Sequence, residues 1–149
     1  MKASVNFTLR QATIDDAPLF YSVIARTMRD LIIATWGVWD ELLVQRESYE
    51  DSSSPNAQVI QIGDVSVGVF TVERFPTYIQ LEQIYLLPKY QRLGIGTRLL
   101  NSLISEASQS QIPVRLRVLA VNSAKMFYEK FGFAVTKATS DFLYMEKSP

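Results

Sequence analysis

Residues 81–103 read LEQIYLLPKYQRLGIGTRLLNSL, and the interpretation of the rest of the chain starts from them. The stretch begins as an apolar strand, which Pro88 ends because proline cannot donate a hydrogen bond to a sheet. It ends as a helix, since apolar residues recur at the i, i+3, i+4 spacing of one stripe: Leu99, Leu100, Leu103, Ile104 and Ala107. The pattern predicts a strand, a turn and a helix in direct succession.

The turn between the two elements is basic and contains glycine: Gln91-Arg92-Leu93-Gly94-Ile95-Gly96. The first N–H groups of a helix have no partner within it and lie at the positive end of the helix dipole, so they attract anions. Glycine lets the backbone approach such a ligand closely. The turn therefore predicts a pyrophosphate-binding site, although a flexible turn before a helix would show the same short pattern.

Two common phosphate-binding loops are excluded. The dinucleotide fingerprint requires a further glycine three residues after Gly96, where this chain has Leu99. A P-loop requires lysine and then serine or threonine after its last glycine, whereas Thr97 and Arg98 follow here. What remains is Q-R-x-G-x-G after a strand that ends at proline.

This pattern resembles motif A of the GNAT superfamily, the acyl-CoA-dependent N-acetyltransferases, whose signature is Q/R-x-x-G-x-G/A. The segment Asn122–Phe133, NSAKMFYEKFGF, is similar to the second signature of the same superfamily, N-x-x-A-x-x-x-Y-x-x-x-G-F. The two signatures occur in the order that the superfamily has. They cover the C-terminal half of the chain, and the N-terminal half agrees in pattern only.

The resemblance implies an α/β (α+β) fold, with a mixed, mainly antiparallel sheet of about seven strands and helices on both faces. In this fold the fourth and fifth strands splay apart, and the pantetheine arm of the cofactor enters the gap and pairs with strand four. Those strands are expected at Tyr78–Leu87 and Val114–Val121. The sequence pattern agrees with the order β-α-α-β-β-β-α-β-α-β-β. The other expected elements are a strand at Val5–Leu9, a helix from Thr13 to about Ile33, a helix from Asp40, strands at Ala57–Ile62 and Val65–Glu73, a helix closed by Gly132, and a last hairpin at Phe133–Val135 and Asp141–Glu146.

Composition limits the possible chemistry. The 149 residues, 48% hydrophobic and 20% charged, are typical of one globular domain over residues 1–149. The sequence contains no cysteine and no histidine, which removes the thiol nucleophile, cysteine-bound zinc, and the commonest general base and metal ligand, so we expect no metal site. Zero net charge argues against a nucleic-acid binder. No apolar run reaches the ~18 residues of a membrane span, and no signal-peptide core is visible at the start, so we expect a cytoplasmic protein.

The charge is unevenly distributed along the chain. Residues 1–75 carry 10 acidic and 6 basic side chains, whereas residues 76–149 carry 5 and 9. The half with the phosphate-binding turn is therefore positive and the other half negative. A polyanionic cofactor on one side and a cationic amine on the other fit this division, which also arises by chance.

The resemblance implies roles for particular residues. Tyr128 matches the motif tyrosine whose hydroxyl lies near the cofactor sulfur and acts as general acid; its spacing alone would also suit a core aromatic. Asn122 matches the residue that bonds the pantetheine arm. A backbone N–H near Leu86 or Leu87 is expected to polarise the reacting carbonyl. The expected binding residues for acetyl-CoA (coenzyme A) are Leu86, Leu87, Gln91, Arg92, Leu93, Gly94, Ile95, Gly96, Thr97, Asn122 and Tyr128.

Glu82 is the expected catalytic base. It lies on the central strand, and a carboxylate within an apolar strand can have a raised pKa. Glu73 is the reserve candidate. The alternative is that Glu82 forms a structural ion pair with Arg115 or Arg117, which are themselves expected to pair with carboxylates of neighbouring strands.

The segment between the first two helices commonly lines the acceptor pocket in GNAT-like proteins. Trp36 and Trp39 could form an apolar or cation–π wall there, with Asp40 or Glu41 attracting an ammonium group. The alternative is that both tryptophans pack a helical corner against the sheet.

These features predict an N-acetyltransferase that moves an acetyl group from acetyl-CoA to a primary amine of a small molecule, peptide or protein. With no cysteine to carry the acyl group, direct attack in a ternary complex is expected, and a serine that carries the acyl group is the formal alternative. The alternative is a catalytically silent GNAT-like module that binds acyl-CoA or forms an interaction surface. The expected partners are acetyl-CoA and an amine acceptor, with no nucleic acid and no membrane, in a monomer or homodimer.

Overall fold

The computed structural model describes residues 5–149. Its strands are β1 (Thr8–Gln11), β2 (Ala57–Ile62), β3 (Val65–Arg74), β4 (Ile79–Leu86), β5 (Val114–Leu119), β6 (Ala134–Ala138) and β7 (Phe142–Lys147). Its α-helices are α1 (Ala17–Trp36), α2 (Glu41–Ser52), α3 (Ile95–Gln109) and α4 (Ala124–Lys130), and short 3₁₀ turns occupy Ile14–Asp16 and Pro88–Tyr90.

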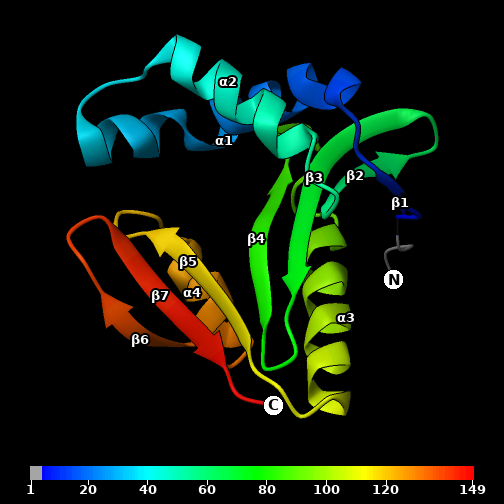
Figure 1. The fold of residues 1–149 in the computed structure, drawn as a ribbon, viewed down its shortest axis with the longest axis vertical. Coiled ribbons are helices and arrows are strands. Elements are labelled where there is room, and N and C mark those ends of the chain that lie inside the picture. The colour runs from blue at the N-terminus through cyan, green and yellow to red at the C-terminus, as the bar shows by residue number, and fades with distance from the viewer. Residues whose placement is uncertain (1–4) are drawn as a thin grey trace.

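Within the described residues the seven strands form one sheet in the order β1-β2-β3-β4-β5-β7-β6 (Figure 1). Neighbouring strands are antiparallel except β4 and β5, which are parallel. The mixed, mainly antiparallel sheet and the predicted order of elements are therefore confirmed. No helix over residues 5–149 is long and apolar enough to cross a membrane.

Local signals explain the helix boundaries. Thr13 and Asp16 form a capping box that starts the first helical segment. Gly37 ends α1 in the left-handed conformation, with φ of 80°, so this helix continues past the predicted Ile33. Asp40 caps α2 by accepting a hydrogen bond from the Leu43 N–H at 3.1 Å. α2 continues to Ser52, so Asp51 belongs to its last turn.

The first strand begins later than its alternating pattern predicts. β1 covers Thr8–Gln11 and pairs with β2, whereas Val5 and Phe7 lie outside it and pack against the hydrophobic core. The apolar alternation correctly predicted that Val5 and Phe7 pack against the core. It did not predict the residue at which hydrogen bonding to β2 starts.

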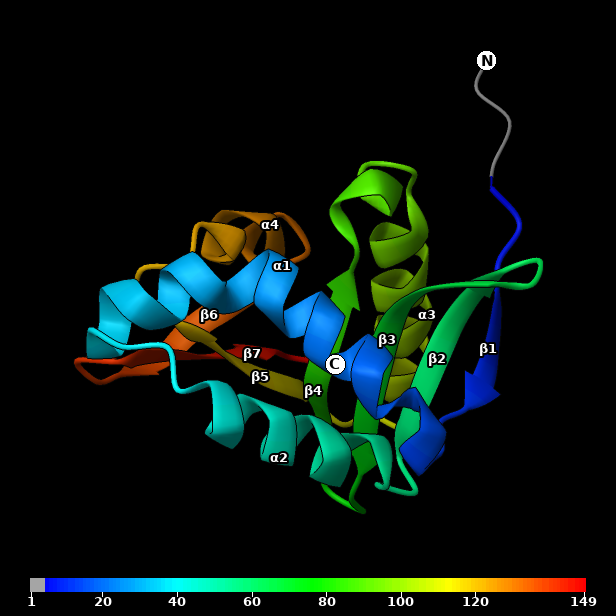
Figure 2. The same cartoon turned by 90° about the horizontal axis from the view of Figure 1, so that it is seen from above.

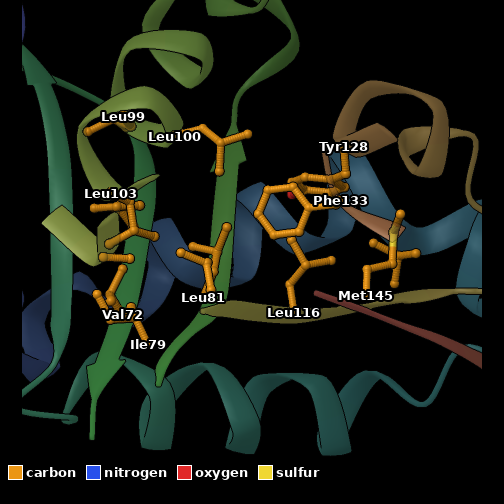
Figure 3. Close-up of a cluster of buried hydrophobic side chains, with 14 of the residues drawn as sticks. Val72, Ile79, Leu81, Leu99, Leu100, Leu103, Leu116, Tyr128, Phe133 and Met145 are labelled. Atoms are coloured by element: carbon orange, nitrogen blue, oxygen red, sulfur yellow. The ribbon is translucent and has the colours of Figure 1, made fainter. Parts of the chain in front are cut away.

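Two hydrophobic clusters cover opposite faces of the sheet. On one face α1 contributes Phe20 and Val23, which pack on Val59 and Val69 of β2 and β3. On the other face a larger cluster joins α3 and α4 to the sheet, and Figure 3 shows Tyr128 and Phe133 above Leu116 and Met145. In Figure 2, α2 and α4 lie on opposite sides of β5 and β7. Helices on both faces agree with the predicted fold.

β4 and β5 separate soon after they meet. Only Ile79 and Gln80 of β4 have partners on β5, Val114 and Arg115, and the two strands diverge beyond them (Figure 1). The backbone edge of β4 facing β5 is therefore unpaired over most of its length. This is the splay that the resemblance implied.

Candidate active site

A cleft of about 1220 Å³ lies where β4 and β5 diverge. Its lining comes from both faces of the sheet: from α1 and α2 on one face, and from the turn before α3 and the start of α4 on the other. The cleft therefore connects the two faces through the gap between β4 and β5.

The turn before α3 has the geometry of an anion-binding loop. Arg92 and Gly94 both have left-handed backbones, with φ of 62° and 83°. The N–H groups of Gly96 and Thr97 form no hydrogen bond with another described residue, since the first helical bond runs from Arg98 to Gly94. A Cβ added to Gly96 would meet nothing within 4 Å. The helix start thus presents free donors beside open space.

The side chain of Gln91 ties this turn to β4. Its Nε2 donates a hydrogen bond to the Leu86 carbonyl oxygen at 2.9 Å. Of the residues expected to bind the cofactor, those that line the cleft are Leu86, Gln91, Arg92, Gly94, Ile95, Gly96, Thr97, Asn122 and Tyr128. Leu87 and Leu93 do not line it. Leu87 packs with the α1 cluster instead, and Leu93 is exposed.

The backbone of Leu86 faces the gap. The Leu87 N–H donates to the Val67 carbonyl of β3 at 2.9 Å, and in an antiparallel ladder successive residues direct their backbone groups to opposite sides. The N–H of Leu86 therefore points away from β3, toward the gap. The sequence left open which N–H, that of Leu86 or that of Leu87, faces the cleft. The N–H of Leu87 is bonded to β3, whereas the N–H of Leu86 points toward the cleft.

Tyr128 is buried and its hydroxyl reaches the cleft. The residue is 8% exposed, and its ring packs edge to face on Phe127 and Phe133. Its hydroxyl makes no hydrogen bond with residues 5–149, and because no fully buried side-chain oxygen of these residues lacks a partner, the hydroxyl oxygen keeps some exposure to the cleft. Burial, and to a lesser degree the nearby Tyr85, raises the pKa of Tyr128 well above the ordinary value of a phenol. The hydroxyl keeps its proton at neutral pH and can act only as a donor of it.

Asn122 lines the cleft and shapes the start of α4. Its Oδ1 accepts a hydrogen bond from the Ala124 N–H at 2.9 Å. Asn122 stands two residues before Ala124, one fewer than in the family signature. The side-chain NH₂ donates to no described residue, so it is available to a ligand.

A family model described as Acetyltransferase (GNAT) domain matches residues 27–144. The chain belongs to this family. Two segments that carry the family signatures, the turn at residues 91–96 and the helix at Tyr128, meet in one cleft of this GNAT domain. No match was found among curated proteins.

Solved structures agree with the family. The PaiA N-acetyltransferase from Thermoplasma acidophilum, in complex with coenzyme A, is 25% identical, with a TM-score of 0.71 over 97% of this chain and 99% of that one. An acetyltransferase from Thermus thermophilus is 20% identical, with a TM-score of 0.74 over 99% and 100%. Arabidopsis thaliana Naa50, in complex with the bisubstrate analogue CoA-Ac-MVNAL, is 18% identical, with a TM-score of 0.66 over 97% and 100%. The last two show the likeness of fold alone.

Glu82 is the extra residue of a β-bulge in β4. Thr71 pairs with Gln83 and Val72 with Leu81, so Glu82 has no partner on β3. Its side chain lines the cleft. Partial burial, followed by the neighbouring carboxylates of Glu73 and Asp51, raises the pKa of Glu82.

The alternative role for Glu82 was an ion pair with Arg115 or Arg117, and the described residues do not form it. Arg115 pairs with Glu146 of β7 at 2.8 Å, as predicted for that arginine, and Arg117 lies 4.2 Å over the Phe142 ring. Within residues 5–149 Glu82 forms no ion pair. Its carboxylate therefore has no fixed cationic neighbour.

Of the three residues expected to bind the acceptor, Trp36 lines the cleft. It is 48% exposed, its ring lies 5.9 Å from that of Phe142, and its Nε1 donates to Asp141 at 3.1 Å. This contact ties the end of α1 to the start of β7. Trp36 therefore lines the cleft while it packs against the strand β7.

Trp39 and Asp40 are not among the residues that line the cleft. The Trp39 indole donates to Glu41 at 2.6 Å and lies under the guanidinium of Arg29, 5.3 Å from its ring. The Asp40 carboxylate accepts the α2 capping bond. Both side chains therefore contact neighbours at the corner between α1 and α2, and the Trp39 contacts are to helical residues and not to the sheet.

Sequence reasoning missed Asp51, which lines the cleft from the last turn of α2. Its Oδ2 accepts a hydrogen bond from Gln83 Nε2 at 3.1 Å, and Gln83 Oε1 accepts one from Thr71 Oγ1 at 3.1 Å. An extension of the helical spacing from Val44 through Ser48 would have placed Asp51 on the inward face.

Proposed function

We propose that this GNAT domain transfers an acetyl group from acetyl-CoA to a primary amine of a small molecule, peptide or protein, by direct attack in a ternary complex. The observation that carries the proposal is the single cleft that joins an anion-binding turn on one face to carboxylates on the other, with the Tyr128 hydroxyl beside the gap. The complexes named for two structural neighbours support it: coenzyme A in one and a CoA–peptide analogue in the other.

The residues present fit acetyl-CoA. The free N–H groups of Gly96 and Thr97, with Arg92 beside them, suit its pyrophosphate. The gap-facing N–H of Leu86 and the free amide of Asn122 suit its amide-containing arm. When bound, acetyl-CoA supplies the thioester. We call the turn at residues 91–97, with the Leu86 edge, the cofactor side of the cleft.

The opposite side is formed by α1, α2 and the β4 residues Glu82 and Gln83, and we call it the acceptor side. An aliphatic amine is protonated near neutral pH, since its pKa is about 10.4, and it must lose a proton before it can attack. Glu82 is positioned on the acceptor side to take this proton. As the C–S bond of the thioester breaks, Tyr128 would donate its hydroxyl proton to the leaving thiolate and would be reprotonated by the second proton that the nitrogen loses on becoming an amide. The Leu86 N–H would polarise the reacting carbonyl.

Thermal shift tests the binding half of the proposal. Acetyl-CoA at 100 times its dissociation constant should stabilise the fold by about 2.7 kcal/mol, which raises Tm by several degrees. NAD and ATP should not, because the turn lacks a Rossmann or P-loop completion. A flat response to millimolar acetyl-CoA would refute the cofactor assignment.

A panel of primary amines, with release of free thiol as the readout, tests the catalytic half. Thiol release that depends on both the amine and the protein is the expected result. If acetyl-CoA stabilises the fold but no amine in a broad panel is acetylated, the protein is a silent acyl-CoA-binding module.

A further inference from the structure

Asp51 is held in place across three elements. Thr71 of β3 is 3% exposed and donates to Gln83 of β4, which in turn donates to Asp51 of α2. The two hydrogen bonds run through the acceptor side and fix one oxygen of the carboxylate. The other oxygen, Oδ1, accepts no hydrogen bond from residues 5–149, while the side chain lines the cleft.

The bulge at Glu82 makes this arrangement possible. Side chains alternate between the two faces of a strand, so a regular strand would put Gln83 on the face of Leu81, which packs against α3. Because Glu82 is an extra residue, the alternation shifts by one. Gln83 consequently turns to the opposite face and reaches α2.

The surroundings of Asp51 favour a cationic ligand. Glu47 and Glu82 also line this part of the cleft, and within the described residues Asp51 forms no ion pair. Burial raises the pKa of Asp51, the Gln83 bond opposes that shift, and Glu47 and Glu50 add to it. A half-buried carboxylate without a counter-ion costs free energy, which a bound ammonium group would offset.

We propose that Asp51 binds the amino group of the acceptor and holds its nitrogen beside Glu82, and that Gln83 is the positioning residue for Asp51. Asp51 Oδ1 accepts a hydrogen bond from one N–H of the ammonium group. This hydrogen bond persists while another proton of the same group passes to Glu82. This inference rests on the proposed N-acetyltransferase function. It assigns Asp51 to acceptor binding, separately from cofactor binding and from leaving-group protonation.

Steady-state kinetics with an amine from the panel test the inference. Asp51→Asn should raise the KM for the amine roughly 10- to 100-fold, the usual range for a lost hydrogen bond to a charged group. The KM for acetyl-CoA should not change, and kcat should change little. Glu50→Gln removes the same charge from the same helix but does not line the cleft, so its amine KM should stay near that of the wild type.

Gln83→Met is the second test variant, because methionine has a similar length but cannot donate a hydrogen bond to the Asp51 carboxylate. Its amine KM should rise by less than that of Asp51→Asn, and the double variant should be no worse than Asp51→Asn alone, as expected if Gln83 acts through Asp51. Thermal melts check that each variant is folded.

The outcomes separate this inference from the function on which it rests. If the wild type acetylates the amine and Asp51→Asn has the same amine KM as Glu50→Gln, the role of Asp51 is refuted and the proposed function stands. Additive effects of Asp51→Asn and Gln83→Met overturn the positioning role of Gln83. If the wild type acetylates no amine, the proposed function fails and this inference fails with it.

Discussion

The cofactor side and the acceptor side of the cleft differ in the kind of group that they present. The cofactor side offers mainly backbone: free N–H groups at the start of α3 and the unpaired edge of β4 at Leu86. The acceptor side offers side chains, with Glu82 from β4, Asp51 from α2 and Trp36 from α1. Recognition on the cofactor side therefore depends on the backbone conformation. Recognition on the acceptor side depends on which side chains face the cleft.

This difference has a consequence for specificity. Backbone groups recognise what every acyl-CoA shares, its pyrophosphate and its amide arm, so they require glycine and a turn rather than particular functional groups. Carboxylates on the acceptor side recognise a positive charge, and their spacing limits which amines fit. We expect substitutions on the cofactor side to remove binding altogether, and those on the acceptor side to change rate or preference.

The largest effect is expected on the cofactor side. Gly96→Glu places a side chain and a negative charge in open space beside the free N–H groups, so stabilisation by acetyl-CoA should be lost completely. Gly96→Ala is the matched control and should stay folded and keep much of the binding. Gly94 is less suitable, because its φ of 83° strains any larger residue. Full acetyl-CoA stabilisation of Gly96→Glu would mean that phosphate does not bind at this turn.

Tyr128 lies between the two sides, and its substitution should lower rate without altering binding. Tyr128→Phe keeps the ring contacts with Phe127 and Phe133 but removes the proton donor, so kcat should fall roughly 10²-fold, as for a lost general acid. Stabilisation by acetyl-CoA should stay unchanged. A near-normal kcat would assign Tyr128 to the core alone; in that case Tyr128→Ala should still cost about 3–5 kcal/mol of stability.

The smallest effect is expected for Glu82 on the acceptor side, and it depends on pH. The raised pKa of Glu82 means that the wild-type base becomes protonated, and kcat/KM falls, as pH decreases through that raised value. Glu82→Gln lacks this ionisation. Its rate should be roughly tenfold low near neutral pH and should recover as rising pH deprotonates the amine directly. A pH–rate profile of the same shape in both proteins, with a lower Tm in the variant, would instead assign Glu82 a structural role.

Prediction from sequence succeeded mainly for local features. Thr13 and Asp40 mark helix starts through bonds within a few residues, and the structure follows those two signals closely. The roles of Trp39 and Asp40 were harder to predict from the sequence, because either side chain can stabilise a helix corner or face a ligand. Which occurs depends on how α1 and α2 pack at their corner, and the two residue types alone do not specify this packing.

The sequence alone determined the family, the order of elements and the glycine-containing turn before α3, because each depends on short-range spacing: glycine at the start of a helix, apolar periodicity, and proline at the end of a strand. Tertiary structure alone decided the acceptor side. The bulge at Glu82 reverses the face of Gln83, and only then can an amide of β4 reach Asp51 of α2. Such a contact joins residues 32 positions apart through a shift in sheet register, and no local pattern in the sequence specifies that shift.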